Sequence, residues 1–208
     1  MKEKCPGMFL DSRHIGLHFQ FVTKSEPRDK EVVDNFDTQI QLLEKYVFSE
    51  YQDDPNLLER IRGIAETCAV ERRGNKSLYF VHILRHVGDL IDKKGSELIR
   101  TEDDKGSVTN QPHIMCFDSE NKVLSFSIFV EKNPLLENIP DIQSAIAAFI
   151  HVSFVLNMSY PKNADLLADV LQRKFAQFGS DLGTRTNKSA KSACKRLDEF
   201  YRRLGALI

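Results

Sequence analysis

The clearest hydrophobic pattern of the chain lies between Ile139 and Lys162, in the stretch IPDIQSAIAAFIHVSFVLNMSYPK. From Ala145 to Leu156 only His151 and Ser153 are polar. A run that is apolar on nearly every face is typical of a helix that is buried on all sides. The run is shorter than the roughly 18 to 20 apolar residues that are needed to span a bilayer. The sequence therefore predicts a central core helix over residues 142–158.

Apolar residues at helical spacing predict further helices in the N-terminal half, over residues 12–22, 32–51, 55–69 and 78–91. In the first of these, Ile15, Phe19 and Val22 form the apolar face, and Leu17 and Phe21 widen it. Asp11 or Ser12 is placed to cap this helix. Inside the fourth helix, Gly88 is interpreted as a position of close packing rather than as part of a site.

The period changes after residue 94. Residues 113–117 and 123–131 are rich in β-forming residues, and the SENK segment between them predicts a tight hairpin connection. In the second run, Leu124, Phe126 and Ile128 alternate with serines, so one face of the strand is expected to pack on the core helix. Because an isolated hairpin is marginally stable, the SELIRT segment or a partner molecule is expected to add a third strand.

Beyond the core helix, Tyr160-Pro161 breaks the chain, and Asn163 is expected to cap a helix that ends near Phe178. A last helix is predicted over residues 188–204. The predicted fold class is α+β and mostly helical, with about six helices around the central buried helix and a small antiparallel sheet. We expect one globular domain over residues 1–208, and a division into a helical half (1–94) and an α/β half (95–208) is the alternative.

Composition narrows the range of partners. Of the 208 residues, 28% are charged and 41% are hydrophobic, and the formal net charge is −1. This charge argues against a partner that is held by the whole surface, such as duplex DNA or anionic lipid. No apolar segment typical of a signal peptide follows the N-terminal MKEKCPGMF. The four cysteines have no paired spacing, which is what we expect of free thiols in a reducing compartment. We expect an intracellular protein without a membrane partner, with nucleus or cytoplasm left open.

Candidate chemistry is sparse. His14 and His18, and likewise His82 and His86, each lie one helical turn apart, a spacing that a metal could bridge. Neither pair is accompanied by a carboxylate or cysteine at ligand spacing, so helix-surface histidines are the favoured interpretation. There is no nucleophile motif, glycine-rich phosphate loop or dinucleotide fingerprint. We therefore predict no catalytic residue, no cofactor and no metal, and a function other than catalysis is favoured.

The distribution of charge is more informative than its sum. Residues 26–60 contain ten acidic and four basic side chains, whereas residues 185–203 contain seven basic and two acidic ones. The simplest interpretation of the basic segment is the solvated face of a terminal helix. The functional alternative is a strip that binds phosphate groups or a protein partner, or that meets the acidic half of a second molecule head to tail. The candidate residues of this basic strip are Lys188, Lys191, Lys195, Arg196, Arg202 and Arg203.

Several segments in order resemble a known group of proteins. The segments are CPGMF, HFQFVT, LLEKYV, VHILRHVGDLI, PHIMCF, FSIFVE and IQSAIAAFIHVSFVLNMSYPKNADLLADVLQRKF. They are similar to largely uncharacterised animal proteins that are named after the sterile alpha motif (SAM) domain carried by some members, and Tyr160, Pro161 and Lys162 match best. The present chain has no recognisable SAM domain, and CPGMF lacks the tryptophan expected nearby. The resemblance implies an interaction module and brings no catalytic residues with it.

Three functional hypotheses follow from these observations. The first is a protein-interaction or scaffold domain that self-associates or binds another protein. The second is a nucleic-acid-binding domain that uses the basic terminal helix, and the third is an enzyme whose dispersed site no motif reveals. The first is preferred because the packing signals are strong, whereas signals for a chemical site are absent.

Overall fold

The computed structural model of the chain describes residues 11–71, 76–92, 94–104, 111–118, 124–161, 163–178 and 188–207. The α-helices in this part are α1 (Ser12–Thr23), α2 (Asp29–Glu50), α3 (Pro55–Glu71), α4 (Ser77–Ile91), α5 (Ile142–Val155), α6 (Asp165–Val170) and α7 (Lys188–Gly205). A 3-10 turn, η2 (Gly95–Glu97), precedes the sheet, and a π-helical turn, η3 (Leu171–Phe175), continues α6. The strands are β1 (Ile99–Thr101), β2 (His113–Asp118), β3 (Leu124–Val130) and β4 (Asn133–Ile139). The predicted α+β fold class is confirmed.

Some predictions concern positions that the structure does not describe. The SENK connection and Lys162 are outside the described residues. The same is true of Cys5 and of the side chains of residues 67–71, 96 and 188–194, which include Cys68 and Cys194. Cys116 is described, and its side chain is buried in β2.

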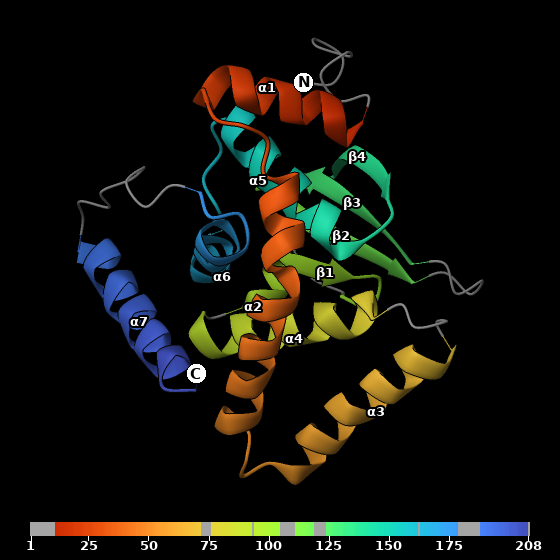
Figure 1. The fold of residues 1–208 in the computed structure, drawn as a ribbon, viewed down its shortest axis with the longest axis vertical. Helices are drawn as coiled ribbons and strands as arrows, with labels where there is room; N and C mark the ends of the chain where they lie inside the picture. The colour runs from red at the N-terminus through yellow and green to blue at the C-terminus, as the bar shows by residue number, and fades with distance from the viewer. Residues whose placement is uncertain are drawn as a thin grey trace.

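Helix α5 forms the centre of the fold, as the apolar run predicts. α1 packs across it, α2 and α4 contact it, and β2, β3 and β4 pack against it as well (Figure 1). Phe149 and Val152 of α5 are fully buried, and the Phe149 ring stacks on Tyr160 with 5.6 Å between centroids. The buried hydrophobic cluster draws residues from both the helical half and the α/β half of the chain. The number of domains stays a prediction.

The sheet has the order β1-β2-β3-β4 and is mixed rather than wholly antiparallel. The predicted hairpin is confirmed, because β2 and β3 pair antiparallel with Ile114 opposite Ile128. β1, in the predicted SELIRT segment, pairs parallel with β2. A parallel pair cannot be joined by the two-residue turn that suffices for an antiparallel hairpin, and β1 and β2 are accordingly separated by eleven residues in the sequence.

The edge strand β4 was not predicted from the sequence. Its pairing with β3 contains register shifts around Ile128, so the buried and exposed positions do not alternate. Pro134 further weakens the strand pattern, although a proline is tolerated on an edge strand. The two-residue period that reveals a strand is therefore missing here.

The apolar face of α1 is narrower than predicted. Ile15 and Phe19 are fully buried, but Leu17, Phe21 and Val22 are 62%, 72% and 53% exposed. The prediction that these three residues join the buried face is therefore wrong. The reason is that α1 packs mainly on the single helix α5, which covers one narrow stripe of a neighbouring helix. The predicted cap is confirmed, because the Asp11 carboxylate accepts the backbone N–H groups of Arg13 and His14.

Helix α6 is capped by a residue from a distant part of the chain. The two oxygens of the buried Asp92 carboxylate accept the backbone N–H groups of Leu166 and Leu167, at 3.3 and 2.8 Å. The predicted cap, Asn163, instead donates from its side chain to Glu97 at 3.1 Å. Asp92 lies at the C-terminal end of α4, so its carboxylate ties two helices together and satisfies amides that would otherwise lack an acceptor.

Helix α4 approaches the η2 turn closely. A Cβ atom built on Gly88 would lie 2.5 Å from the Gly95 Cα atom and 2.9 Å from Leu167 Cδ2. No side chain fits at such distances, so the interpretation of Gly88 as a position of close packing is confirmed.

Candidate functional site

The cations at the C-terminal end of the predicted basic strip contact other groups of this protein. Arg203 donates to both carboxylate oxygens of Glu50 at 2.8 and 2.9 Å and to Glu199 at 2.9 Å. Arg202 forms a bidentate pair with Glu199, and these arginines together lower the pKa of Glu199 to about 2. Arg196 donates to the backbone carbonyl of Ile91 at 3.2 Å. The arginines therefore help to attach α7 to α2 and α4.

The remaining residues of the basic strip are lysines. Lys195 is exposed on α7, while the side chains of Lys188 and Lys191 lie outside the described residues. On the other side of the helix, Leu197, Phe200 and Leu204 are buried against the body of the protein. A small cavity of about 340 Å³ lies between α7 and the ends of α2 and α4.

The histidine pairs show no metal-binding geometry among the described residues. His14 Nδ1 lies 2.9 Å from the Asp11 carboxylate. Burial lowers the pKa of His82 to about 4, and the His86 ring packs edge-on against Tyr51. Nowhere in the described ranges do three or more His, Cys, Asp or Glu side chains gather in a way that could hold a metal ion.

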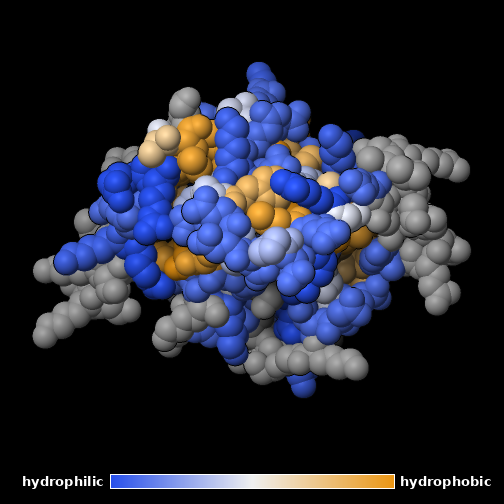
Figure 2. Space-filling view, turned by 90° about the horizontal axis from the view of Figure 1, so that it is seen from below, coloured by the Kyte–Doolittle hydropathy of each residue, from blue (hydrophilic) through white to orange (hydrophobic). Residues whose placement is uncertain are grey.

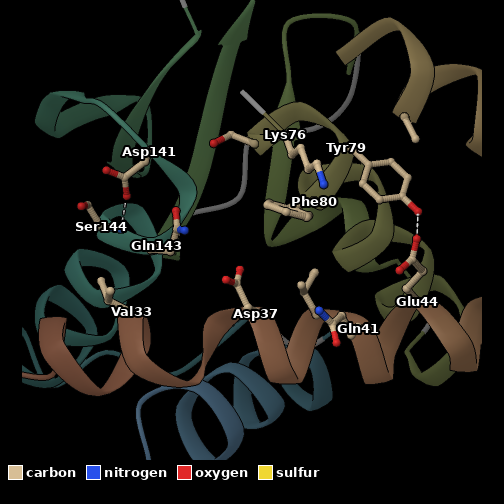
Figure 3. A pocket seen from close by; sticks show the side chains of 13 residues that line it. Val33, Asp37, Gln41, Glu44, Lys76, Tyr79, Phe80, Asp141, Gln143 and Ser144 are labelled. Carbon is tan, nitrogen blue, oxygen red and sulfur yellow. Dashed lines mark hydrogen bonds between the residues drawn. The ribbon is translucent and has the colours of Figure 1, made fainter. Parts of the chain in front are cut away.

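A cavity of about 870 Å³ lies between α2 and the N-terminal ends of α4 and α5 (Figure 3). We call it the acidic cavity. Its lining consists of Val33, Asp37, Ile40, Gln41, Glu44, Ala65, Lys76, Ser77, Tyr79, Phe80, Asp141, Gln143 and Ser144. This volume falls within the range of natural ligand sites, roughly 300 to 1,000 Å³.

Helical periodicity explains how α2 forms one wall of the acidic cavity. Val33, Asp37, Ile40 and Glu44 follow one another at steps of three or four residues, so they share one side of the helix. An adjoining side of α2 carries Phe36 and other buried residues, which fix the orientation of the helix in the core. This packing holds the polar side chains of α2 in place along the wall of the cavity.

The apolar part of the cavity wall is held in place by the core. The Phe80 ring lines the cavity and packs edge-on against the fully buried Phe36, with 5.1 Å between centroids. Val33 is 58% exposed at the rim of the cavity, where a partner could cover it. The cavity thus combines a rigid aromatic surface with an uncovered aliphatic side chain.

The cavity carries an excess of negative charge. Its lining includes three carboxylates, those of Asp37, Glu44 and Asp141, against the single ammonium group of Lys76. Glu44 accepts a hydrogen bond from the Tyr79 hydroxyl, and Asp141 caps α5 by accepting the Ser144 N–H at 2.7 Å. Asp37 is exposed and points from α2 into the open space in Figure 3. The Asp37 carboxylate is therefore placed to meet a cation of a ligand.

The chemistry of the lining favours binding over catalysis. None of the lining residues is a histidine or a cysteine. Burial and the hydrogen bond to Glu44 raise the pKa of the Tyr79 hydroxyl, which makes it a poorer nucleophile and base near neutral pH.

Sequence reasoning missed the acidic cavity because its walls come from distant parts of the chain. Residues 33–44, 76–80 and 141–144 meet only in the folded protein. One signal was present, since Asp37 and Glu44 belong to the acidic segment 26–60. Nothing in that segment distinguishes these two carboxylates from acidic residues that face solvent elsewhere.

The surface supplies a second candidate feature. Large hydrophobic side chains are exposed on α1 at Leu17, Phe21 and Val22. By contrast, the face on which α2 ends and α3 begins is mostly hydrophilic, and its hydrophobic residues form separate groups (Figure 2). Of the helices that the structure describes, none has the length and hydrophobicity required to cross a membrane.

A scan against protein-family models, a search of curated proteins and a search of solved structures each found no match for this chain.

Proposed function

We propose that this protein is a protein-interaction domain whose acidic cavity receives a partner segment that carries basic and apolar side chains. The observation that carries the proposal is the composition of the cavity, in which Asp37 and Glu44 lie on the same wall as Val33, and Phe80 lies across from this wall. A cation pairs with the carboxylates, while an apolar side chain of the same segment covers Val33 and the Phe80 ring. The sequence resemblance to proteins of the SAM group favours the same functional class.

The charges of the protein make a nucleic-acid partner the weaker hypothesis. The carboxylates of the acidic cavity repel phosphate groups. In the basic strip, Arg202 and Arg203 already pair with Glu199 and Glu50, so phosphate binding would have to break those pairs. An enzymatic function is also weaker, because the cavity lining offers neither a histidine nor a cysteine.

Peptide binding tests the proposed function. We would measure fluorescence anisotropy with a labelled synthetic peptide in which arginine alternates with leucine and phenylalanine at helical spacing, and with a matched peptide in which glutamate replaces arginine. The arginine peptide should bind at least tenfold more tightly, and raising the salt concentration should weaken its binding.

The variant Asp37→Arg should weaken binding of the arginine peptide at least tenfold. Asp34→Arg is the matched control, because Asp34 is an exposed carboxylate on the same helix that does not line the cavity. Equal affinity for both peptides, or equal losses in the two variants, would show that the cavity does not select a basic segment.

A further inference from the structure

We propose that the segment received by the acidic cavity is the outward face of α1 of a second copy of this chain, so that molecules associate head to tail. This inference rests on the proposed function of the cavity and names its occupant. Each molecule carries both surfaces, the outward face of α1 and the acidic cavity, and the described contacts of this chain leave both of them open. The proposal joins the α1 face of one copy to the cavity of the next.

The outward face of α1 has the chemistry that the cavity requires. Arg13, Leu17 and Phe21 follow one another at steps of four residues, so they lie on one side of the helix, and Lys24 follows as its C-cap. All four are exposed, and the Lys24 ammonium group lies 4.4 Å from the centre of the Phe21 ring. The face therefore presents two large apolar side chains between two cations.

The opposing surfaces match in charge and in length. The two cations of α1 are opposed by a cavity with an excess of carboxylates. Leu17 and Phe21 can cover Val33 and Phe80. Arg13 and Lys24 are eleven positions apart, and so are Val33 and Glu44 on α2. At 1.5 Å per residue each of these distances along a helix is about 16 Å, so α1 of one copy can lie along the α2 wall of another.

The α1 face cannot fill the cavity of its own molecule without leaving the core. Its inner residues Ile15 and Phe19 are fully buried, and the Phe19 ring lies 4.6 Å from His151 of α5. The connection to α2 is also fixed, because the backbone N–H of Arg28 donates to His151 Nε2 at 2.9 Å. In Figure 1, α1 lies across one end of the molecule and α2 runs away from it. The exposed face of α1 is therefore directed away from the rest of the molecule.

The outward face of α1 suits the cavity better than the basic strip of α7 does. The cations of α7 nearest the C-terminus are paired within the molecule, whereas Leu17 and Phe21 of α1 are uncovered. Burial of apolar side chains supplies most of the free energy of association, and the charges select the partner. Because the two joined surfaces differ, each added molecule leaves one surface of each kind open, which gives rings or chains.

Mixing two complementary variants tests this arrangement. The double variant Leu17→Asp, Phe21→Asp destroys the α1 face and keeps the cavity, whereas Asp37→Arg changes the cavity and keeps the α1 face. By light scattering and sedimentation, each variant alone should associate at least tenfold more weakly than the wild type. Mixed together they should form a 1:1 dimer and nothing larger, because only one of the two possible interfaces is intact.

Two controls keep the outcome decisive. Asp34→Arg should associate like the wild type, and melting temperatures should confirm that all variants are folded. If the apolar double variant does not fold, Arg13→Glu, Lys24→Glu replaces it, since both side chains are exposed. A wild type that stays monomeric at millimolar concentration, or variants that associate as the wild type does, would overturn the inference. In that case binding of the arginine peptide to the cavity would still support the proposed function. If neither self-association nor peptide binding were observed, both proposals would be refuted.

Discussion

Asp92 makes the stability of this protein depend on pH through the cap of α6. Burial raises the pKa of the Asp92 carboxyl from 3.8 to about 7, and the charge of Asp165 adds to this. The hydrogen bonds from Leu166 and Leu167 and the charge of Arg196 act in the opposite direction. In the folded protein the carboxyl therefore keeps a proton at pH values at which the unfolded chain has lost it.

The sign and size of the effect follow from proton linkage. Because the folded pKa is above the unfolded one, Asp92 contributes stability that is fully present below pH 3.8 and is lost as the pH rises to about 7. Each pKa unit corresponds to about 1.4 kcal/mol, and about two units of this window lie above pH 5. Between pH 5 and pH 8 the contribution of Asp92 to the free energy of unfolding should therefore fall by about 3 kcal/mol.

The variant Asp92→Asn isolates this contribution. Its amide does not titrate, and its side-chain oxygen can still accept one of the two N–H groups of α6. Urea denaturation at pH 5 and at pH 8 gives, for each protein, the change in the free energy of unfolding between the two pH values. Between pH 5 and pH 8 the free energy of unfolding of the wild type should fall by about 3 kcal/mol more than that of the variant. Burial lowers the pKa of both His82 and His151 to about 4, so they also titrate, but their effect is common to both proteins and cancels. Equal pH differences in the two proteins would refute the reasoning.

Two further predictions concern packing. Gly88→Ala should destabilise the protein by about 3 kcal/mol or more, because the new methyl group meets the backbone of Gly95. The control Gly63→Ala should stabilise α3 by about 0.5 to 1 kcal/mol, because its new methyl group meets no neighbouring element within 4 Å. Similar urea midpoints for these two variants would contradict the proposed close approach of α4 and η2. Phe149→Ala should cost about 3 to 5 kcal/mol, and Phe149→Asp should prevent stable folding because it buries an unpaired charge. A thermal melt of Phe149→Asp like that of the wild type would show that α5 is not buried.

Several elements of this fold could be predicted from local patterns in the sequence. The core helix α5 was predictable because a helix that is buried on all sides must be apolar on every face. The β2–β3 hairpin was predictable because a strand with one buried face alternates apolar and polar residues. The cap at Asp11 was predictable because a carboxylate just before a helix reaches the first free amides. In each case the physical cause acts within a few residues of the chain, so a single sequence displays it.

Features that depend on a distant neighbour could not be predicted in this way, because they arise from the packing of the folded chain. Leu17 and Phe21 have the same hydrophobicity as Ile15 and Phe19, and the single helix α5 beneath α1 decides which pair is buried. Asp92 caps α6 although it lies 73 positions before Asp165 at the start of that helix, and the acidic cavity joins four segments that are far apart in the sequence. These outcomes depend on which surfaces meet when the chain folds, because burial and charge act through space. Hydrophobic periodicity shows only which side of each element is apolar, and it does not show which other element will cover that side.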